Sequence, residues 1–406
     1  MRLLECLESV NPALGGVVES TRQRCIALQE LGHKVETISQ DDLADPWSME
    51  WPTEVHALGR GITRYGFNPR VDKWIEQNFP RFDAVIVNSV WRYLGCGVRN
   101  GLRNSAVPYF VVPHSSLNPW FQTSTSLKSI LKVATWRLIE WRVLREARCV
   151  LYTCEEERRL ARKTYRPYAC NEDVLSLVGT SIPSGESIPD ESLFSSFPQL
   201  RGKRIILYLS RIHPMKGCDL LIKAFSRICA EDPTLHLVIA GPAEVGFAAA
   251  LRQIAKQCVV EGRIAWTGLL LKEMKLAALR SACLFALPSH CEAFPVALVE
   301  ALGFGVPALI TDKVNIWRDV SEAEAGFVDT DTVEGTVRSL RRWLQLSGAE
   351  RLAMRKNALR CFSERFEAKS NAIRFVEGLR GHGVCDDSLA EAPSELIMRS
   401  HACNSK

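Results

Sequence analysis

Residues 288–307 read Pro-Ser-His-Cys-Glu-Ala-Phe-Pro-Val-Ala-Leu-Val-Glu-Ala-Leu-Gly-Phe-Gly-Val-Pro. The apolar run 282–287 that precedes them predicts a buried strand. Pro295 favours the first position of a helix, and the glycines and proline of 303–307 end that helix. A buried strand followed directly by a helix is the repeating unit of a parallel α/β sheet.

Two glutamates mark this unit as a candidate binding site. Glu292 is expected in the loop at the helix N-terminus, and Glu300 lies about 7–8 Å further along the axis. The free N–H groups near Phe294 favour a phosphate at this end of the helix. A nucleotide-sugar fits such a pair, with one carboxylate at the sugar and the other at the ribose. Taken alone, the pair is also compatible with an ordinary helix-start charge and a solvated helix residue.

Length and composition limit the class of protein. A chain of 406 residues predicts two domains, and 47% hydrophobic with 24% charged residues is typical of a globular protein. The net charge of +5 is too small to indicate nucleic-acid binding. The 14 cysteines show no C-x-x-C spacing and indicate a reducing, cytoplasmic setting. We expect no signal peptide and no transmembrane helix.

Strands and helices alternate in both halves of the chain. Each half therefore predicts a parallel sheet, and the two sheets face each other across a cleft. A Ser/Pro-rich linker is expected at 181–200 and a disordered tail at 384–406. The expected strands are 2–8, 34–39, 83–87, 109–112, 204–210, 236–240, 263–267, 284–287 and 308–310, and the expected helices include 17–31, 219–228 and 244–257.

Two cations follow the strand 204–210. Arg211 and Lys216 lie on the loop to the next helix, where they could hold a diphosphate and stabilise its charge as it leaves. For an isolated pair of this kind, solvated loop cations are the commoner explanation.

The first half offers weaker signals. Gly15 and Gly16 follow its first strand and permit close backbone approach to a ligand, although an ordinary turn explains them equally well. His114 follows the strand 109–112 and could donate to a sugar hydroxyl or a phosphate, although a lone histidine at a strand end is more often structural. The Asp-x-Asp triplet 329–331 is interpreted as a helix-capping loop, so no metal site is predicted.

The stretch 126–149 interleaves basic residues with tryptophans and aliphatic residues. It predicts either a helix on an anionic membrane surface or a cover helix with a solvated basic face.

Together these positions resemble the family 4 (group 1) retaining glycosyltransferases. The family's Glu-x7-Glu motif corresponds to Glu292 and Glu300, and its Arg…Lys-Gly loop to Arg211 and Lys216. The segment Pro113-His114…Trp120 resembles the subgroup that builds bacterial surface polysaccharides. Departures are Asn88-Ser89 after the strand 83–87, and Gly179-Thr180-Ser181-Ile182-Pro183 in place of a Pro-Asn-Gly turn.

The resemblance implies the GT-B fold, with an N-terminal domain 1–190, a nucleotide-sugar domain 200–360 and a last helix, 361–379, that packs back on the first domain. It also implies a role for each site residue. Arg211 and Lys216 would neutralise the diphosphate. Gly15 and Gly16 would close on the phosphates, and Phe294 and Pro295 would contribute the loop. Glu300 would bind the ribose, and Glu292 and His114 would contact the transferred sugar.

The implied activity is retaining, metal-independent transfer of a hexose from a UDP- or GDP-sugar to a saccharide, with no cofactor. The acceptor is expected to be lipid-linked, and the enzyme cytoplasmic and peripheral on the inner face of the plasma membrane. An epimerase or phosphorylase of the same fold, or a non-catalytic nucleotide-sugar binder, is the alternative.

Overall fold

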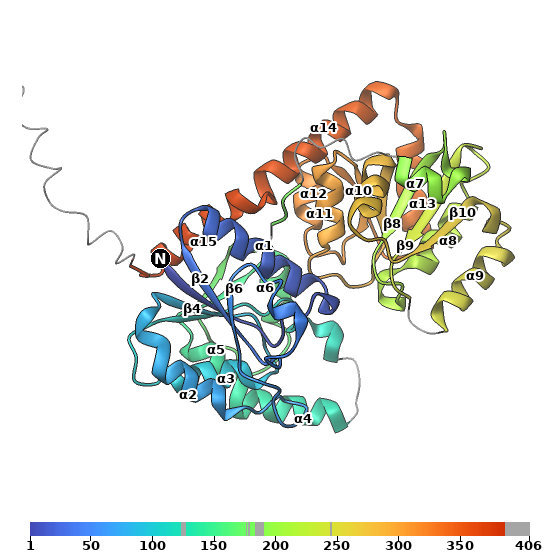
Figure 1. Ribbon diagram of the computed structural model, residues 1–406. Helices are drawn as coiled ribbons and strands as arrows, with labels where there is room; N and C mark the ends of the chain where they lie inside the picture. The colour runs from blue at the N-terminus through green and yellow to red at the C-terminus, as the bar shows by residue number, and fades with distance from the viewer. Residues whose placement is uncertain (123–126, 176, 178, 183–190, 244–245, 386–406) are drawn as a thin grey trace, which may run out of the picture.

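The computed structural model describes residues 1–122, 127–175, 177, 179–182, 191–243 and 246–385. Two α/β domains, each built on a parallel sheet, lie side by side (Figure 1), which confirms the predicted fold class. The expected tail at 384–406 falls almost wholly outside the described residues, except that Val384 is buried in the core of the N-terminal domain.

The N-terminal domain contains a seven-stranded sheet in the order β3-β2-β1-β4-β5-β6-β7, and every pairing is parallel. Apolar residues pack on both of its faces as two separate clusters. The strands are β1 (Arg2–Cys6), β2 (Lys34–Ser39), β3 (Glu54–Ala57), β4 (Ala84–Val87), β5 (Tyr109–Val111), β6 (Cys149–Tyr152) and β7 (Glu172–Val174). The helices are α1 (Gly16–Glu30), α2 (Pro69–Asn78), α3 (Tyr93–Gly101), α4 (Leu127–Thr135), the π-helix η5 (Trp136–Glu140), α5 (Trp141–Glu146) and α6 (Glu155–Ala161).

The C-terminal domain contains a six-stranded parallel sheet in the order β10-β9-β8-β11-β12-β13, around one continuous core. Its strands are β8 (Arg204–Leu209), β9 (Leu235–Ala240), β10 (Ile264–Gly268), β11 (Ala282–Leu287), β12 (Ala308–Thr311) and β13 (Gly326–Asp329). Its helices are α7 (Glu191–Ser196), α8 (Cys218–Ser226), α9 (Phe247–Gln257), α10 (Lys272–Ser281), α11 (Val296–Gly303), α12 (Trp317–Glu322), α13 (Val333–Gln345) and α14 (Gly348–Arg365).

Several of these elements have no clear signal in the sequence. β3, β6, β7 and β13 were not expected. The expected linker 181–200 contains α7 and the turn Pro198–Leu200, and both belong to the C-terminal core because Leu193 and Leu200 are fully buried there. Part of the linker, 183–190, falls outside the described residues.

The chain passes between the domains twice. The expected single helix 361–379 is in fact two helices, because Glu367 interrupts it and caps α15 (Ala368–Gly381) through the N–H groups of Lys369 and Ser370. α15 then packs against α1, as Figure 1 shows. The two crossing segments are hydrogen-bonded to each other: Thr180 N donates to Phe366 O at 3.0 Å, and Ala368 N donates to Thr180 O at 3.3 Å.

Both sheets place their carboxyl ends toward the space between the domains. The strand order reverses between β1 and β4 in one sheet and between β8 and β11 in the other, and such points are where open α/β sheets bind ligands. Further along, Asn315 Nδ2 donates to Ser115 Oγ at 3.1 Å, and Arg318 pairs with Glu156, so the domains are in direct contact on the β5 and β12 side.

Candidate functional site

The loop between β11 and α11 is held in place by its own backbone. Glu292 N donates to Lys313 O at 3.1 Å, and Glu292 O accepts from Asn315 N at 3.0 Å. Pro295 is extended and caps α11, which begins at Val296 rather than at the proline that the sequence suggested. The position of Glu292 therefore depends on the residues that follow β12.

Lys216 and Glu292, predicted separately, form an ion pair in the structure. The β8 loop contains the 3₁₀ turn η7 (Pro214–Lys216) and then Gly217, whose φ of 66° is left-handed. A side chain at Gly217 would place its Cβ 1.9 Å from Pro288 O, so a glycine is required for the β8 loop to lie against the β11 loop. The Lys216 Nζ contacts Glu292 Oε2, and their side chains are only 7% and 12% exposed.

An ammonium group carries three hydrogens, so Lys216 retains donors for a second partner. Arg211, on the same loop, is exposed. The loop therefore offers one buried and one exposed cation beside the start of α11.

Glu300 lies further along α11 and has a partner that the sequence did not indicate. Lys275 Nζ, on α10, donates to Glu300 Oε1 at 2.6 Å, whereas Glu300 Oε2 is buried and has no hydrogen-bond partner among the described residues. Burial raises the pKa of Glu300, although Lys275 opposes this rise. One oxygen of this carboxylate is thus free to accept from a ligand hydroxyl.

The N-terminal domain brings a second helix start to the same place. Gly15 has a left-handed φ of 85°, and Gly16 is the first residue of α1. A Cβ built on Gly16 would lie 4.0 Å from the Cγ2 of Val296, the first residue of α11. Each helix N-terminus carries unpaired N–H groups and a partial positive charge. Two such ends that lie close together favour an anion between them.

His114 lies at the carboxyl end of β5 and is half-buried. Its Nε2 is 3.0 Å from Asn88 Oδ1. Burial, together with the nearby Arg24 cation, lowers the pKa of His114 to about 3. The ring is therefore neutral in the physiological pH range.

Beside the Glu292 loop, residues of both domains line a cavity of about 330 Å³. It includes the exposed Trp120, whose ring is parallel to that of His290 at a centroid distance of 6.4 Å. His290 Nδ1 is 2.8 Å from Asp331 Oδ2, so one member of the Asp-x-Asp triplet supports the cavity wall, while Thr332 caps α13.

The structure thus brings Glu292, Lys216 and the helix starts at Gly16 and Val296 together, with Glu300 further along α11. Phe294 instead packs edge-on against Phe366 at 5.8 Å, so its side chain supports the contact between the domains. Sequence reasoning missed Lys275, Asn88 and Asn315. Asn88 did stand out as a departure from the family pattern, whereas nothing marked Lys275, because its partner lies on another helix.

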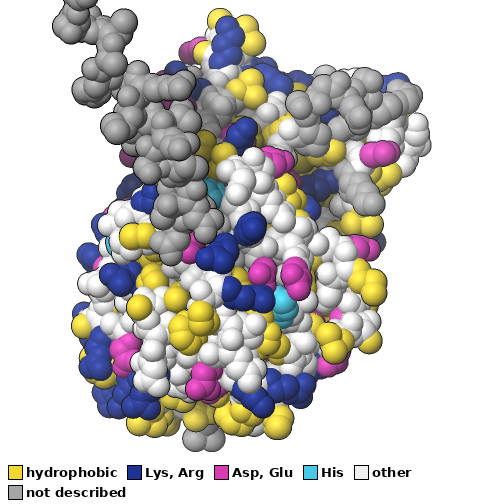
Figure 2. Space-filling view, turned by 60° about the vertical axis from the view of Figure 1, so that its left-hand side comes forward, with side chains coloured by type: hydrophobic (Ala, Val, Ile, Leu, Met, Phe, Trp, Pro, Cys, Tyr) yellow, Lys and Arg dark blue, Asp and Glu magenta, His cyan; other side chains and the backbone are white. Residues whose placement is uncertain are grey.

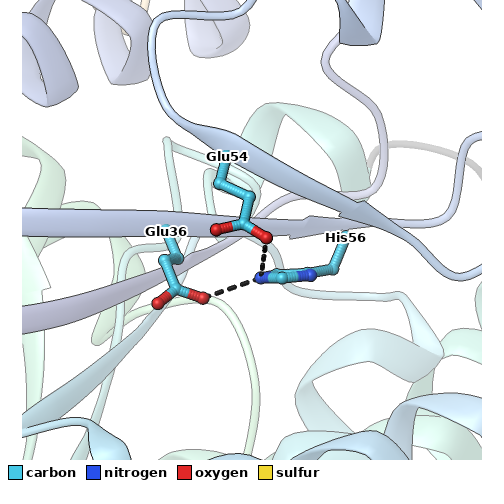
Figure 3. Close-up of side chains that lie close together, drawn as sticks. All are labelled: Glu36, Glu54 and His56. Atoms are coloured by element: carbon cyan, nitrogen blue, oxygen red, sulfur yellow. Dashed lines mark hydrogen bonds and ion pairs between the residues drawn. The ribbon is translucent and has the colours of Figure 1, made fainter.

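A group of possible metal ligands lies outside this cleft. Glu36, Glu54 and His56 converge on β2 and β3, at the edge of the sheet (Figure 3). His56 Nε2 is 2.7 Å from Glu36 Oε2, and Arg81 also pairs with Glu36. Because Arg81 already supplies a positive charge, this group is explained as an ion-pair cluster.

The described part of the basic stretch 126–149 contains α4, η5 and α5. Trp136 is buried, stacks on Tyr165 and donates to Pro167 O at 2.8 Å, so it does not face outward. The exposed surface is instead an apolar ridge made by Ile130, Leu131, Val133 and Leu138. Figure 2 shows hydrophobic and basic side chains next to one another along the lower rim, the height at which Figure 1 places α4. Among the described residues, no helix is long and apolar enough to cross a membrane.

Comparison with known families accounts for most of the chain. Residues 15–171 match the family described as "Glycosyl transferase 4-like domain", and residues 190–360 match "Glycosyl transferases group 1". The D-inositol 3-phosphate glycosyltransferase of Rhodococcus jostii is 27% identical over 201 residues, which are 48% of this chain and 44% of the relative. The gpi3 subunit of phosphatidylinositol N-acetylglucosaminyltransferase from Schizosaccharomyces pombe is 25% identical over 313 residues, 74% of this chain and 63% of the relative. The matches thus span less than two thirds of either relative.

Among solved structures, Anabaena HepE in complex with UDP and glucose superposes with a TM-score of 0.72 at 17% identity, over 94% of this chain and 100% of that chain. This likeness confirms the GT-B arrangement of the two domains.

Proposed function

The chain belongs to the group 1 glycosyltransferases, and we propose that it transfers a hexose from a nucleotide-sugar to a saccharide acceptor with retention of anomeric configuration. The observation that carries the proposal is the meeting of two helix N-termini, at Gly16 and Val296, beside Lys216. A diphosphate between them would lie among backbone donors and a buried ammonium. These groups favour the leaving nucleoside diphosphate because its charge grows as the sugar–phosphate bond breaks.

The remaining residues fit around such a donor. The free Oε2 of Glu300 can accept from a ribose hydroxyl, and Arg211 can reach the diphosphate from the exposed side. We propose that Lys216 and Arg211 supply the positive charge, with no metal ion required. Glu292 would then contact the sugar from the C-terminal domain and His114 from the N-terminal domain.

The cavity beside Glu292 is the proposed acceptor site. Trp120 offers an aromatic face, and polar side chains from both domains line the rest of the cavity. The cavity lies between the Glu292 loop and the N-terminal domain, and this position would place an acceptor hydroxyl near the transferred sugar.

We further propose that the acceptor is lipid-linked and that the enzyme is cytoplasmic and acts at the membrane surface in surface-polysaccharide synthesis. The apolar ridge on α4 and η5 supports this, because Ile130, Leu131 and Leu138 are each more than 60% exposed. Cations flank the ridge at Lys132, Arg137, Arg142 and Arg145. A cation near an anionic leaflet contributes about 1 kcal/mol, and apolar side chains that enter the interface add to this. The fission yeast relative, by its name, acts on phosphatidylinositol.

Transfer is tested by incubating the protein with UDP- and GDP-sugars and an extract of lipid-linked saccharides. Nucleotide release that depends on acceptor, together with a new glycosidic bond of retained configuration by NMR, is the expected result. An epimerase would change the donor sugar without nucleotide release. A phosphorylase would require inorganic phosphate, and a non-catalytic binder would be stabilised by donors without turnover.

Membrane contact is tested separately by sedimentation with vesicles that contain anionic phospholipid. Changing Leu131 and Leu138 to Glu is expected to abolish binding and leave donor binding intact. The matched control changes the exposed Leu43 and Leu352 to Glu, which lie outside the ridge. Equal binding by both variants, or none by the wild type at low salt, contradicts the proposal.

A further inference from the structure

A chain of buried hydrogen bonds connects α1 to His114. Arg24 of α1 forms a bidentate ion pair with Glu5 of β1, with Nε–Oε1 at 2.8 Å and Nη2–Oε2 at 2.9 Å. Asn88, which follows β4, contacts both members of the pair. His114 Nε2 then contacts Asn88 Oδ1 at 3.0 Å. The side chains of Arg24 and Glu5 are 2% and 0% exposed.

The partners of Asn88 determine which way its amide faces. Asn88 Nδ2 is 2.6 Å from Glu5 Oε2, a carboxylate oxygen that accepts, so this atom must be the NH₂ group. Asn88 Oδ1 is 2.9 Å from Arg24 Nη2, a nitrogen that only donates. The oxygen of the amide therefore faces His114.

This orientation fixes the proton on the imidazole ring. Since Asn88 Oδ1 can only accept, His114 Nε2 must carry the hydrogen. The ring is neutral, so Nδ1 carries a lone pair and cannot donate. Among the described residues, Nδ1 has no hydrogen-bond partner. A phosphate oxygen needs a donor, whereas a sugar hydroxyl can donate to Nδ1.

The backbone at His114 supports a functional role for this arrangement. His114 and Ser115 both have left-handed φ angles, 47° and 58°. Consecutive non-glycine residues in this region store strain, which is usually found where a side chain must be directed at a ligand. Asn118 N and Ser116 N close the turn through Ser115 O and Pro113 O.

We propose that Arg24 and Asn88 are positioning residues that hold His114 as its Nε2–H tautomer, so that Nδ1 accepts a hydrogen bond from a hydroxyl of the donor sugar. The sugar contact rests on the proposed function, whereas the tautomer does not. Arg24 also donates to Leu177 O at 3.2 Å and lies over the Phe375 ring at 5.3 Å. The same guanidinium therefore also connects α1 with Leu177, just before the first crossing, and with α15, which follows the second.

The test begins with the ligand-free protein, labelled with ¹⁵N-histidine. His114 is expected to show a neutral ring with the proton on Nε2 from pH 7 down to pH 5, and a His114→Gln variant assigns the signal. In Asn88→Leu, which leaves the Glu5–Arg24 pair in place, the Nε2–H preference is expected to weaken. A proton on Nδ1 in the wild type, or an unchanged tautomer in Asn88→Leu, overturns the proposal whether or not the protein transfers sugar.

The sugar contact is tested with UDP-glucose and UDP as probes, or with the matching GDP pair if that base is accepted. Asn88→Leu is expected to lower kcat/KM for the nucleotide-sugar on the order of tenfold, the range of one hydrogen bond with an unpaired partner. Affinity for the free nucleotide is expected to be unchanged, because His114 does not contact the phosphates. Equal loss of nucleotide affinity indicates general damage to the fold and contradicts the proposed role.

Arg24 needs a double variant, because its removal alone leaves the buried Glu5 without its cationic partner. Glu5→Gln with Arg24→Met removes both charges together and is expected to reproduce the tautomer change of Asn88→Leu. The matched control is Arg99→Leu, which breaks a bidentate pair with Glu146 on the outer surface of the same domain. If the double variant keeps the wild-type tautomer and rate, Arg24 has only a structural role.

Discussion

The two sides of the cleft use buried ion pairs in different ways. On the N-terminal side, each oxygen of Glu5 has a partner, and Arg24 is fully enclosed. On the C-terminal side, Lys275 is 30% exposed and one oxygen of Glu300 has no partner among the described residues. A fully satisfied network fixes side chains, whereas a partly satisfied one retains hydrogen-bonding capacity. In the proposed reaction, this difference would let the N-terminal side orient His114 while the C-terminal side exchanges partners with the substrate.

The largest effect is expected from loss of the buried ion pair on the N-terminal side of the cleft. Arg24→Met should lower the free energy of unfolding by about 3–5 kcal/mol, because Glu5 remains buried without a compensating positive charge. Lys275→Met should cost less, because Glu300 can take up a proton. Urea denaturation of both variants measures the difference. Similar losses in the two would remove the distinction between the sides.

The next largest effect is expected on the C-terminal side of the cleft. Lys216→Ala should lower kcat by about 10²–10³-fold, or about 3–4 kcal/mol, which is the range for loss of one group that stabilises developing charge. Steady-state rates with UDP-glucose or GDP-mannose measure it. Lys223→Ala is the control, since Lys223 pairs with Asp219 on the following helix. A rate within twofold of the wild type would exclude Lys216 from the reaction.

The two sides should also respond to pH with opposite sign. The pKa of His114 is lowered to about 3, so below its ordinary value of about 6.5 the unfolded state binds a proton that the folded state does not. Stability should therefore fall as pH falls from about 6.5 toward 3, by at most about 1.4 kcal/mol per pH unit from this group. The pKa of Glu300 is raised, so its contribution is present at low pH and is lost as pH rises above the usual glutamate range.

Thermal unfolding across pH, with His114→Gln and Glu300→Gln, separates these contributions. His114→Gln should flatten the acid side of the profile, and Glu300→Gln should flatten the loss on the rising side. The same change in both variants would mean that neither group titrates as its surroundings indicate.

The smallest expected effect comes from metal removal. If Arg211 and Lys216 supply the positive charge at the diphosphate, treatment with EDTA should leave turnover unchanged. Loss of activity that Mg²⁺ or Mn²⁺ restores would show that a metal ion supplies the positive charge at the diphosphate instead.

The sequence predicted what depends on local chemistry. Apolar runs located most of the strands whose carboxyl ends form the site. Pro295 and the glycines that follow Glu300 located the helix. What it missed depends on contacts across the fold. Lys275 reaches Glu300 from another helix, and the edge strand β3 has no continuous apolar run that would mark it.

The sequence also did not reveal which face of the segment 126–149 is buried. The pattern of 126–149 is amphipathic, and the buried face includes Trp136, whose direction the sequence did not indicate. Whether a tryptophan faces inward depends on the partners available, here Tyr165 and Pro167. The interruption of the expected helix at Glu367 was also not predicted. The Glu367 side chain caps α15, and this capping competes with continuation of the preceding helix.

The bond between the two crossing segments has a mechanical consequence. Because Thr180 is hydrogen-bonded to Phe366 and Ala368, the two crossing segments are held to each other at this point, and we expect any rotation of one domain against the other to turn about it. Gly179 lies against Ala368, where a Cβ would come within 2.7 Å of its Cα, so this point is tightly packed. A small rotation there moves atoms in proportion to their distance from it. Opening would therefore separate the facing starts of α1 and α11 while the pivot itself stays packed.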